Sequence, residues 1–110
     1  MPGELLYKVL REAEWREAQT QGAVAGSADD LRDGFIHLST RGQLAGTLDR
    51  HFAGETGLVV LEIAADRLNV GLKWEPSRDG ALFPHLYGVL PLDAVIGTVS
   101  ISPPDRNRRS

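Results

Sequence analysis

The sequence predicts an α+β fold: a compact single domain with a mostly antiparallel, twisted sheet of five or six short strands and two main helices. Segments rich in strand formers outnumber helical segments and do not alternate with them, which favours an antiparallel sheet over βαβ units. The chain has 110 residues, of which 42% are hydrophobic and 25% charged. That is the length and composition of one globular domain.

The first predicted elements are a strand, a helix and a second strand. Residues 5–10 are short and rich in strand formers. Residues 12–21 are dense in good helix formers, and Gly22 can end that helix in a left-handed cap. Ser27 can cap a short helical turn before residues 35–39, which are predicted to form a strand with alternating faces.

The second main helix is predicted to begin at Thr40. Thr40 and Gln43 form a capping box, in which each side chain satisfies a backbone amide of the other residue. Apolar residues follow at four-residue steps, the pattern of one buried helix face. They are Leu44, Leu48 and Phe52.

The second half of the chain is predicted to be mostly strand. The predicted strands are residues 58–63, 70–75 and 94–101. Residues 76–80 have the composition of a loop. We expect residues 83–87 to be extended or irregular, because Pro84 cannot donate to a sheet ladder. The single domain is expected to span residues 1–102, followed by a flexible polar tail over residues 103–110.

Charge and targeting patterns exclude several classes. The net charge of −3 argues against nucleic acid as a partner, because nucleic-acid binders carry a basic excess. The chain contains no segment of about 20 apolar residues and no signal peptide, so we expect no membrane association. It contains no cysteine, which removes thiol chemistry and fits a cytoplasmic location. The phosphate loop, the dinucleotide fingerprint, the zincin motif and the hydrolase elbow are all absent.

The first candidate site segment is residues 34–40. On a strand, His37 and Ser39 share a face with Phe35, while the two aliphatic residues between them share the other. We expect the His–Ser face to line a cleft or to meet solvent, and His37 to act as an acid, a base or a hydrogen-bond donor. Ser39 and Thr40 are the predicted ligand-binding residues beside it, because the following helix directs backbone amides here. Alternatively, His37 is structural and its imidazole is hydrogen-bonded to a backbone carbonyl.

The second and third segments are residues 73–77 and 83–88. Glu75 lies at a strand end, where binding groups concentrate, although a surface role is equally consistent with its position. Core packing is the favoured interpretation of Trp74, with ligand binding as the alternative. His85 and Tyr87 point the same way if their segment is extended, and form a polar clamp with an aromatic wall. A structural role for Tyr87, tied back to the main chain, is the alternative.

Histidine and glutamate side chains can also bind metal ions. His37, Glu75 and His85 are suitable for zinc or iron, but their spacing matches no known metal motif, so we expect no metal. His51 lies near the C-terminal end of its helix, where a cation suits the helix dipole. We therefore expect His51 to be structural or exposed.

Residues throughout the chain resemble a family of small bacterial proteins without assigned activity, family 952 of the domains of unknown function. The resemblance runs from about residue 6 to residue 101. It rests on Tyr7, Lys8, Trp15, residues 35–40, Trp74, Glu75 and residues 83–88. It implies a compact α+β domain and brings no reaction.

The histidine-bearing strand followed by Ser-Thr and a helix also resembles the core of ADP-ribosyltransferase-type folds. That resemblance implies an NAD-like nucleotide as substrate. His37 would hold its ribose, Tyr87 would stack on a ring, and Glu75 or His85 would orient the attacking group. This likeness concerns the fold, which does not establish a function.

Three functions follow as hypotheses. The first is an enzyme of group transfer or hydrolysis on a nucleotide-like or other polar small molecule, with His37, Glu75 and His85 as catalytic residues. The second is a non-catalytic small-ligand or sensor module, and the third is an accessory interaction domain. Convergence of these side chains with Tyr87 in one pocket would contradict the third hypothesis, and their scattering would contradict the first.

Overall fold

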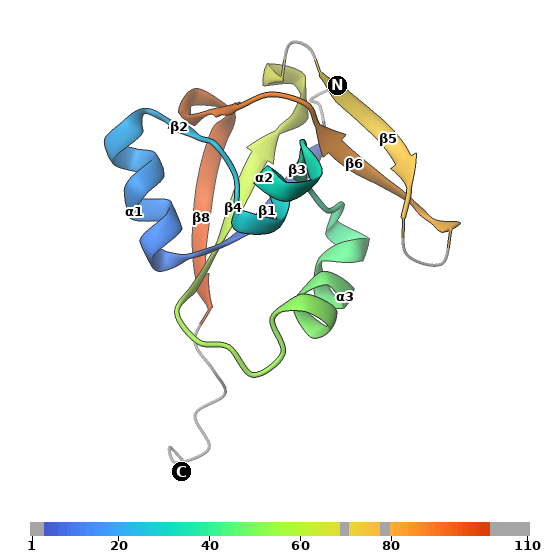
Figure 1. Cartoon of the computed structure of the whole chain (residues 1–110), viewed down its shortest axis with the longest axis horizontal. Coiled ribbons are helices and arrows are strands. Elements are labelled where there is room, and N and C mark those ends of the chain that lie inside the picture. The colour runs from blue at the N-terminus through green and yellow to red at the C-terminus, as the bar shows by residue number, and fades with distance from the viewer. Residues whose placement is uncertain (1–3, 69–70, 78–79, 102–110) are drawn as a thin grey trace.

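Three long antiparallel strands form the centre of the molecule (Figure 1). The computed structural model describes residues 4–68, 71–77 and 80–101. In it, β4 (Leu58–Ala64) lies between β1 (Leu5–Arg11) and β8 (Val95–Ile101). The middle strand is nearly all apolar because hydrophobic clusters cover both of its faces.

The other strands of the described part form two smaller sheets. The first pairs β2 (Ala23–Val24) with β7 (Leu90–Pro91), two short strands that the sequence pattern did not predict. The second places β6 (Leu82–Leu86) between β3 (Ile36–His37) and β5 (Leu72–Pro76). All of these pairings are antiparallel, which confirms the predicted α+β class.

Two main helices and one short helix complete the fold. They are α1 (Glu12–Gln21), α2 (Ala28–Asp33) and α3 (Arg41–His51), with short 3₁₀ turns at η1 (Ala65–Arg67) and η3 (Leu92–Ala94). As predicted, Gly22 adopts a left-handed conformation (φ 88°) at the end of α1. The predicted capping box of α3 also forms, because Thr40 Oγ1 accepts from the Gln43 amide and Gln43 Oε1 accepts from the Thr40 amide.

The hydrophobic core has two parts, one on each face of the central sheet. The larger contains Leu6, Leu10, Leu61 and Ile63 together with residues of the smaller sheets, and Trp15 of α1 packs against it. The smaller contains Tyr7, Val9, Leu58 and Val60, and is covered by Leu44, Leu48 and Phe52 of α3. The two long helices therefore lie on opposite sides of the sheet (Figure 1).

Of the two alternatives predicted for residues 83–87, the extended one is confirmed for residues 83–86, which lie in β6. Pro84 fits in this middle strand, where its carbonyl accepts the Leu38 amide at 3.0 Å. The favoured core packing of Trp74 is wrong, because this residue is 40% exposed and belongs to neither hydrophobic cluster. The β5–β6 hairpin that carries it projects to one side of the molecule (Figure 1). The predicted polar tail over residues 103–110 and the strand start at Val70 lie outside the described residues.

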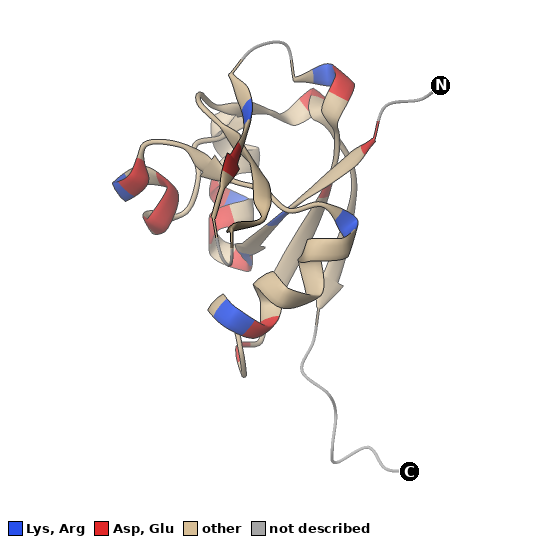
Figure 2. Cartoon of the chain, turned by 90° about the vertical axis from the view of Figure 1, so that its right-hand side faces the viewer, with Lys and Arg blue, Asp and Glu red and all other residues tan. Residues whose placement is uncertain are grey.

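The structure has no helix among its described residues with the length and hydrophobicity to cross a membrane. Acidic and basic residues are interspersed along the described part of the chain (Figure 2). The short helix α2 shows this best, since it carries three aspartates and one arginine within six residues (Figure 2).

Candidate functional site

The site begins at α2, which the chain enters through a tight backbone approach. Ser27 caps the helix, with its Oγ accepting from the Asp30 amide and its own amide donating to Asp30 Oδ2. Gly26 has φ 116°, and a Cβ there would lie 2.7 Å from the Asp30 Cβ. Glycine is therefore required at position 26, because any side chain there would collide with Asp30. Gly34, also left-handed, ends the helix and turns the chain into β3.

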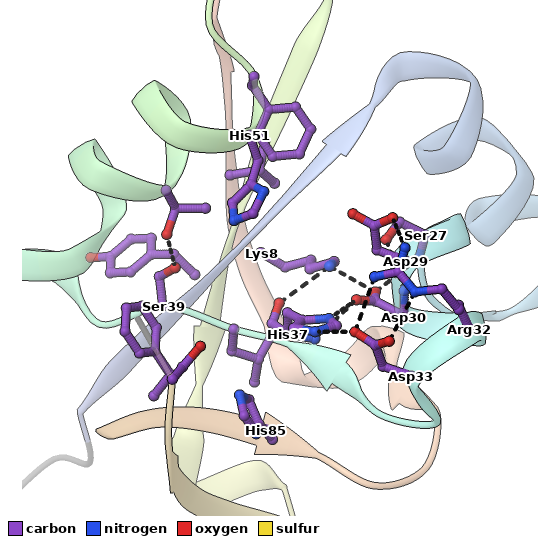
Figure 3. Close-up of a pocket in the computed structure, with 17 residues that line it drawn as sticks. Lys8, Ser27, Asp29, Asp30, Arg32, Asp33, His37, Ser39, His51 and His85 are labelled. Carbon is purple, nitrogen blue, oxygen red and sulfur yellow. Dashed lines mark hydrogen bonds and ion pairs between the residues drawn. The ribbon is translucent and has the colours of Figure 1, made fainter. Parts of the chain in front are cut away.

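Asp30 is a buried carboxylate with four contacts. Its side chain is 1% exposed. Oδ2 lies 2.7 Å from Lys8 Nζ and accepts from the Ser27 amide, while Oδ1 accepts from the His37 amide and lies 2.6 Å from His37 Nδ1 (Figure 3). Lys8, itself 6% exposed, also donates to the His37 carbonyl at 3.2 Å. Every acceptor position of the carboxylate is thus used, as a buried charge requires.

This environment keeps Asp30 ionised. Burial alone raises the pKa of a carboxyl group, and it is the largest single influence here. The hydrogen bond from His37 and the positive charge of Lys8 act together in the opposite direction and outweigh it. The pKa of Asp30 therefore lies well below its ordinary value.

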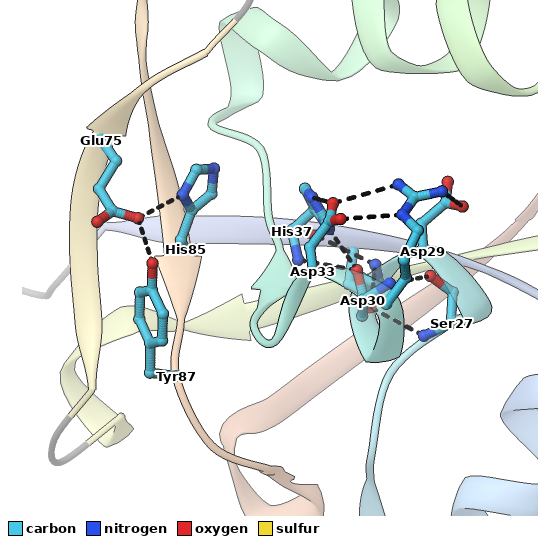
Figure 4. A network of polar contacts seen from close by, with 10 residues as sticks. Ser27, Asp29, Asp30, Asp33, His37, Glu75, His85 and Tyr87 are labelled. Carbon is cyan, nitrogen blue, oxygen red and sulfur yellow. Dashed lines mark hydrogen bonds and ion pairs between the residues drawn. The ribbon is translucent and has the colours of Figure 1, made fainter.

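His37 is held by carboxylates at both ring nitrogens. Its Nδ1 faces Asp30, and its Nε2 lies 3.0 Å from Asp33 Oδ2 (Figure 4). A hydrogen bond from Arg32 is the main cause of the lowered pKa of Asp33, so this carboxylate also only accepts. Both ring nitrogens of His37 are therefore engaged by carboxylates.

His85 lies directly opposite His37 on the paired strand, yet has a different environment. Its Nδ1 is 2.8 Å from Glu75 Oε1, and the same oxygen accepts from the Tyr87 hydroxyl at 2.8 Å (Figure 4). These two hydrogen bonds, that from His85 first, hold the pKa of Glu75 below its ordinary value. The bond to Glu75 likewise raises the pKa of Tyr87. His85 Nε2 has no hydrogen-bond partner among the described residues.

Phe35 packs the two histidines into one aromatic group. Its ring is stacked on His85 at 4.1 Å between centroids, and lies 4.6 Å from His37 and 5.1 Å from Tyr87. The centroids of the two imidazoles are 5.6 Å apart, edge to face. The rotamers of both rings are therefore restricted on one side by packing and on the other by carboxylates.

A pocket of about 230 Å³ opens at this group, between β1, α2, α3 and β6 (Figure 3). Its wall includes both histidines, Lys8 and Ser39, together with His51 of α3. Since no buried side-chain nitrogen or oxygen of the described residues lacks a partner, His85 Nε2 must be accessible, and the pocket is where His85 is open. The remaining lining residues are Tyr7, Val9, Ser27, Asp29, Asp30, Arg32, Asp33, Leu38, Thr47, Phe52, Ser77 and Phe83.

The predicted site residues divide into three groups. His37, Ser39 and His85 line the pocket, and Ser39 Oγ lies 2.8 Å from the Thr47 hydroxyl. Glu75 and Tyr87 do not line the pocket; Glu75 accepts hydrogen bonds from His85, which does, and from Tyr87. Thr40 and Trp74 are outside the wall, Thr40 as the cap of α3.

A scan of known families matches residues 9–98 to the family described as "Protein of unknown function (DUF952)". The chain belongs to this family. The crystal structure of protein CC0527 from Caulobacter crescentus is similar to this chain, with 48% identity and a TM-score of 0.83, covering 86% of this chain and 83% of that one. The solution NMR structure of CC0527 is similar at 46% identity and a TM-score of 0.80, covering 92% and 87%. No curated protein matches the chain significantly.

Sequence reasoning missed the carboxylate side of this DUF952 site. Lys8 and Asp30 form its buried ion pair, and Asp33 holds the second nitrogen of His37. One signal was present: Lys8 lies on the strand face between Leu6 and Leu10, both fully buried, and so needed a buried partner. Within the described ranges, no three His, Asp or Glu side chains are arranged to hold a metal ion.

Proposed function

We propose that the pocket binds a nucleotide-like or other polar small molecule, and that the protein is an enzyme of group transfer or hydrolysis. The observation that carries the proposal is that the two ring nitrogens of His85 differ: Nδ1 is bound to Glu75, and Nε2, beside the pocket that His85 lines, has no partner among the described residues. An imidazole oriented by a carboxylate, with its second nitrogen toward a ligand, is the arrangement of a general base.

The proposed role of each residue follows from its contacts. Ionised Glu75 accepts a hydrogen bond from Nδ1–H of His85, so in the neutral imidazole the free lone pair lies on Nε2. When Nε2 takes a proton from the ligand, the carboxylate stabilises the resulting imidazolium. Tyr87 fixes the Glu75 oxygen. Glu75 and Tyr87 are thus positioning residues, and His85 is the group that meets the ligand.

His37 receives a structural role in this proposal. A base must release and accept protons at an accessible nitrogen, whereas each nitrogen of His37 is occupied by an aspartate. Removing the proton from either nitrogen would break a contact to an ionised carboxylate. The contact to a ribose that the ADP-ribosyltransferase-type likeness implies for His37 is therefore assigned to His85.

A nucleotide-like ligand is supported by the wall of the pocket. Tyr7 and Phe83 provide apolar ring surface, and Ser39 provides a hydroxyl group. The volume of about 230 Å³ is below the roughly 300–1,000 Å³ of sites that enclose drug-sized ligands. An NAD-like molecule would therefore place only one part of itself inside. This ligand class rests on the fold-level resemblance together with the lining, and the experiment below tests it.

The test is a panel of adenine and nicotinamide nucleosides, mononucleotides and dinucleotides, measured by thermal unfolding and then by product analysis. The expected result is a raised Tm with at least one member, and turnover by the native protein that is lost in His85→Ala. Asp49→Asn, an exposed change on α3, is the control and should keep both properties.

Each other outcome would contradict a stated part of the proposal. Binding without turnover would contradict the enzyme and leave a sensor module. Turnover that survives in His85→Ala would contradict the assigned base. A panel without any shift would contradict the ligand class.

A further inference from the structure

The charged groups of the pocket wall neutralise one another. The lining lysine and arginine of the described chain are Lys8 and Arg32. Lys8 Nζ is 2.7 Å from Asp30, and Arg32 lies 2.9 Å from Asp33 and 3.2 Å from Asp29. Three carboxylates therefore face two fixed cations. The wall has no excess of positive charge for an anionic ligand.

Backbone amides at the wall are also engaged. Phosphate groups are commonly bound by amides at helix N-termini. Here the Ser27 amide donates to Asp30 Oδ2, and the Asp30 amide donates to Ser27 Oγ. The amides of these two lining residues are thus not available to a phosphate group.

The accessible nitrogen of His85 selects a donor. With Nδ1 donating to Glu75, Nε2 of the neutral ring accepts a hydrogen bond. A hydroxyl group of a ligand provides that hydrogen, whereas a fully ionised phosphate has only acceptor oxygens. The hydroxyl of Ser39 and the ring surfaces of Tyr7 and Phe83 complete a wall suited to an uncharged, hydroxyl-bearing molecule.

We propose that the pocket takes the uncharged nucleoside part of its ligand, with a sugar hydroxyl on His85 Nε2, and excludes the phosphate groups. This inference rests on the proposed function, because it specifies which part of a nucleotide-like ligand enters. It predicts that a nucleoside binds more tightly than its own 5′-monophosphate, the reverse of a site that recognises phosphate.

The test compares two matched pairs by isothermal titration calorimetry: adenosine with adenosine 5′-monophosphate, and the reduced, uncharged form of nicotinamide riboside with its 5′-monophosphate. The expected Kd of the better-binding nucleoside is at least about tenfold lower than that of its monophosphate. Its Kd should change little between low and high salt, because no net charge is paired. Inorganic phosphate should not compete.

Substitutions at the wall should move this preference in opposite directions. Asp33→Asn keeps an acceptor for His37 Nε2 but removes one negative charge, so the preference should fall by at least about threefold, and monophosphate binding should become salt-dependent. Arg32→Gln removes a cation, so the preference should be kept or increased. The exposed Asp49→Asn should leave it unchanged, and circular dichroism should confirm that all three variants fold.

The outcomes separate this inference from the proposed function. Tighter binding of the monophosphates, or competition by inorganic phosphate, would overturn the inference while keeping a nucleotide ligand. An unchanged preference in Asp33→Asn would also overturn it, since the charge balance would then not be its cause. If no member of either pair binds, the inference and the ligand class of the proposed function both fail.

Discussion

His37 and His85 face each other across two paired strands, with ring centroids 5.6 Å apart, and yet their environments are opposite. His37 lies between Asp30 and Asp33, which contact its two ring nitrogens, and Asp30 is also buried in an ion pair with Lys8. His85 is fixed at one nitrogen and accessible at the other. Residue type and even position on a sheet therefore do not decide the role of a histidine. The number of its nitrogens that the protein itself uses is the informative property.

The largest expected effect comes from removing Asp30, the buried partner of His37. Asp30→Ala should lower the free energy of unfolding by about 3–5 kcal/mol, because it leaves the buried charge of Lys8 without its counter-ion and removes the partner of His37 Nδ1. Chemical denaturation would measure the loss. Asp66→Ala, an exposed change in η1, is the control and should stay within about 0.5 kcal/mol. A loss below about 1 kcal/mol for Asp30→Ala would contradict the account of this network.

Acid should weaken the same network. The pKa of Asp30 in the folded protein is below its unfolded value of about 3.9. Its contribution to stability is thus fully present above that value and is lost as the pH falls toward the folded pKa. Urea unfolding followed from about pH 6 down to pH 3 should show a steeper loss in the native protein than in Asp30→Asn. Parallel curves would contradict the lowered pKa.

These effects could not be predicted from the sequence, whereas much of the local structure could. The caps at Ser27 and Thr40, the left-handed Gly22 and the apolar strand β4 depend on neighbouring residues, so their patterns are visible in the chain. Lys8 and Asp30 are 22 positions apart, and only the fold shows that they meet. The two-residue strands β2 and β7 likewise depend on long-range pairing.

The site itself was predictable in part for the same reason. His85 of β6 and Tyr87, just after that strand, meet at a spacing of two residues, and Glu75 contacts both from the neighbouring strand. Alternation placed Trp74 opposite Glu75, but it could not show that Trp74 belongs to neither hydrophobic cluster. Nor could it show that aspartates of α2 occupy both nitrogens of His37.

The His85 side of the comparison should respond in activity more than in stability. Glu75→Gln keeps a side chain of the same shape but removes the charge that stabilises the imidazolium of His85. Turnover of the substrate found in the nucleotide panel should fall by about 10–100-fold, the usual effect of losing an orienting partner. The matched change Glu62→Gln, away from the pocket lining on β4, should leave turnover intact. Equal effects of both variants would contradict the positioning role.

The smallest expected effect is at Tyr87. Tyr87→Phe removes only the hydroxyl that holds Glu75, so turnover should fall by less than about fivefold. Because the folded pKa of Tyr87 is raised, its contribution to stability is present below about pH 10 and is lost as the pH rises through the folded value. Thermal unfolding above pH 10 should therefore decline more steeply in the native protein than in Tyr87→Phe. The reverse order would show that Glu75 does not accept this hydroxyl.

The contrast between the two histidines is tested most directly by long-range ¹⁵N–¹H correlation spectra of the imidazole rings at neutral pH. The spectra distinguish protonated from unprotonated ring nitrogens without any ligand or assay. We predict that the ring N–H signals of His37 are hydrogen-bonded and protected from exchange with water, and that the neutral tautomer of His85 carries its proton on Nδ1. A neutral His85 ring protonated at Nε2 alone, or His37 ring protons that exchange as fast as those of an exposed imidazole, would contradict the account.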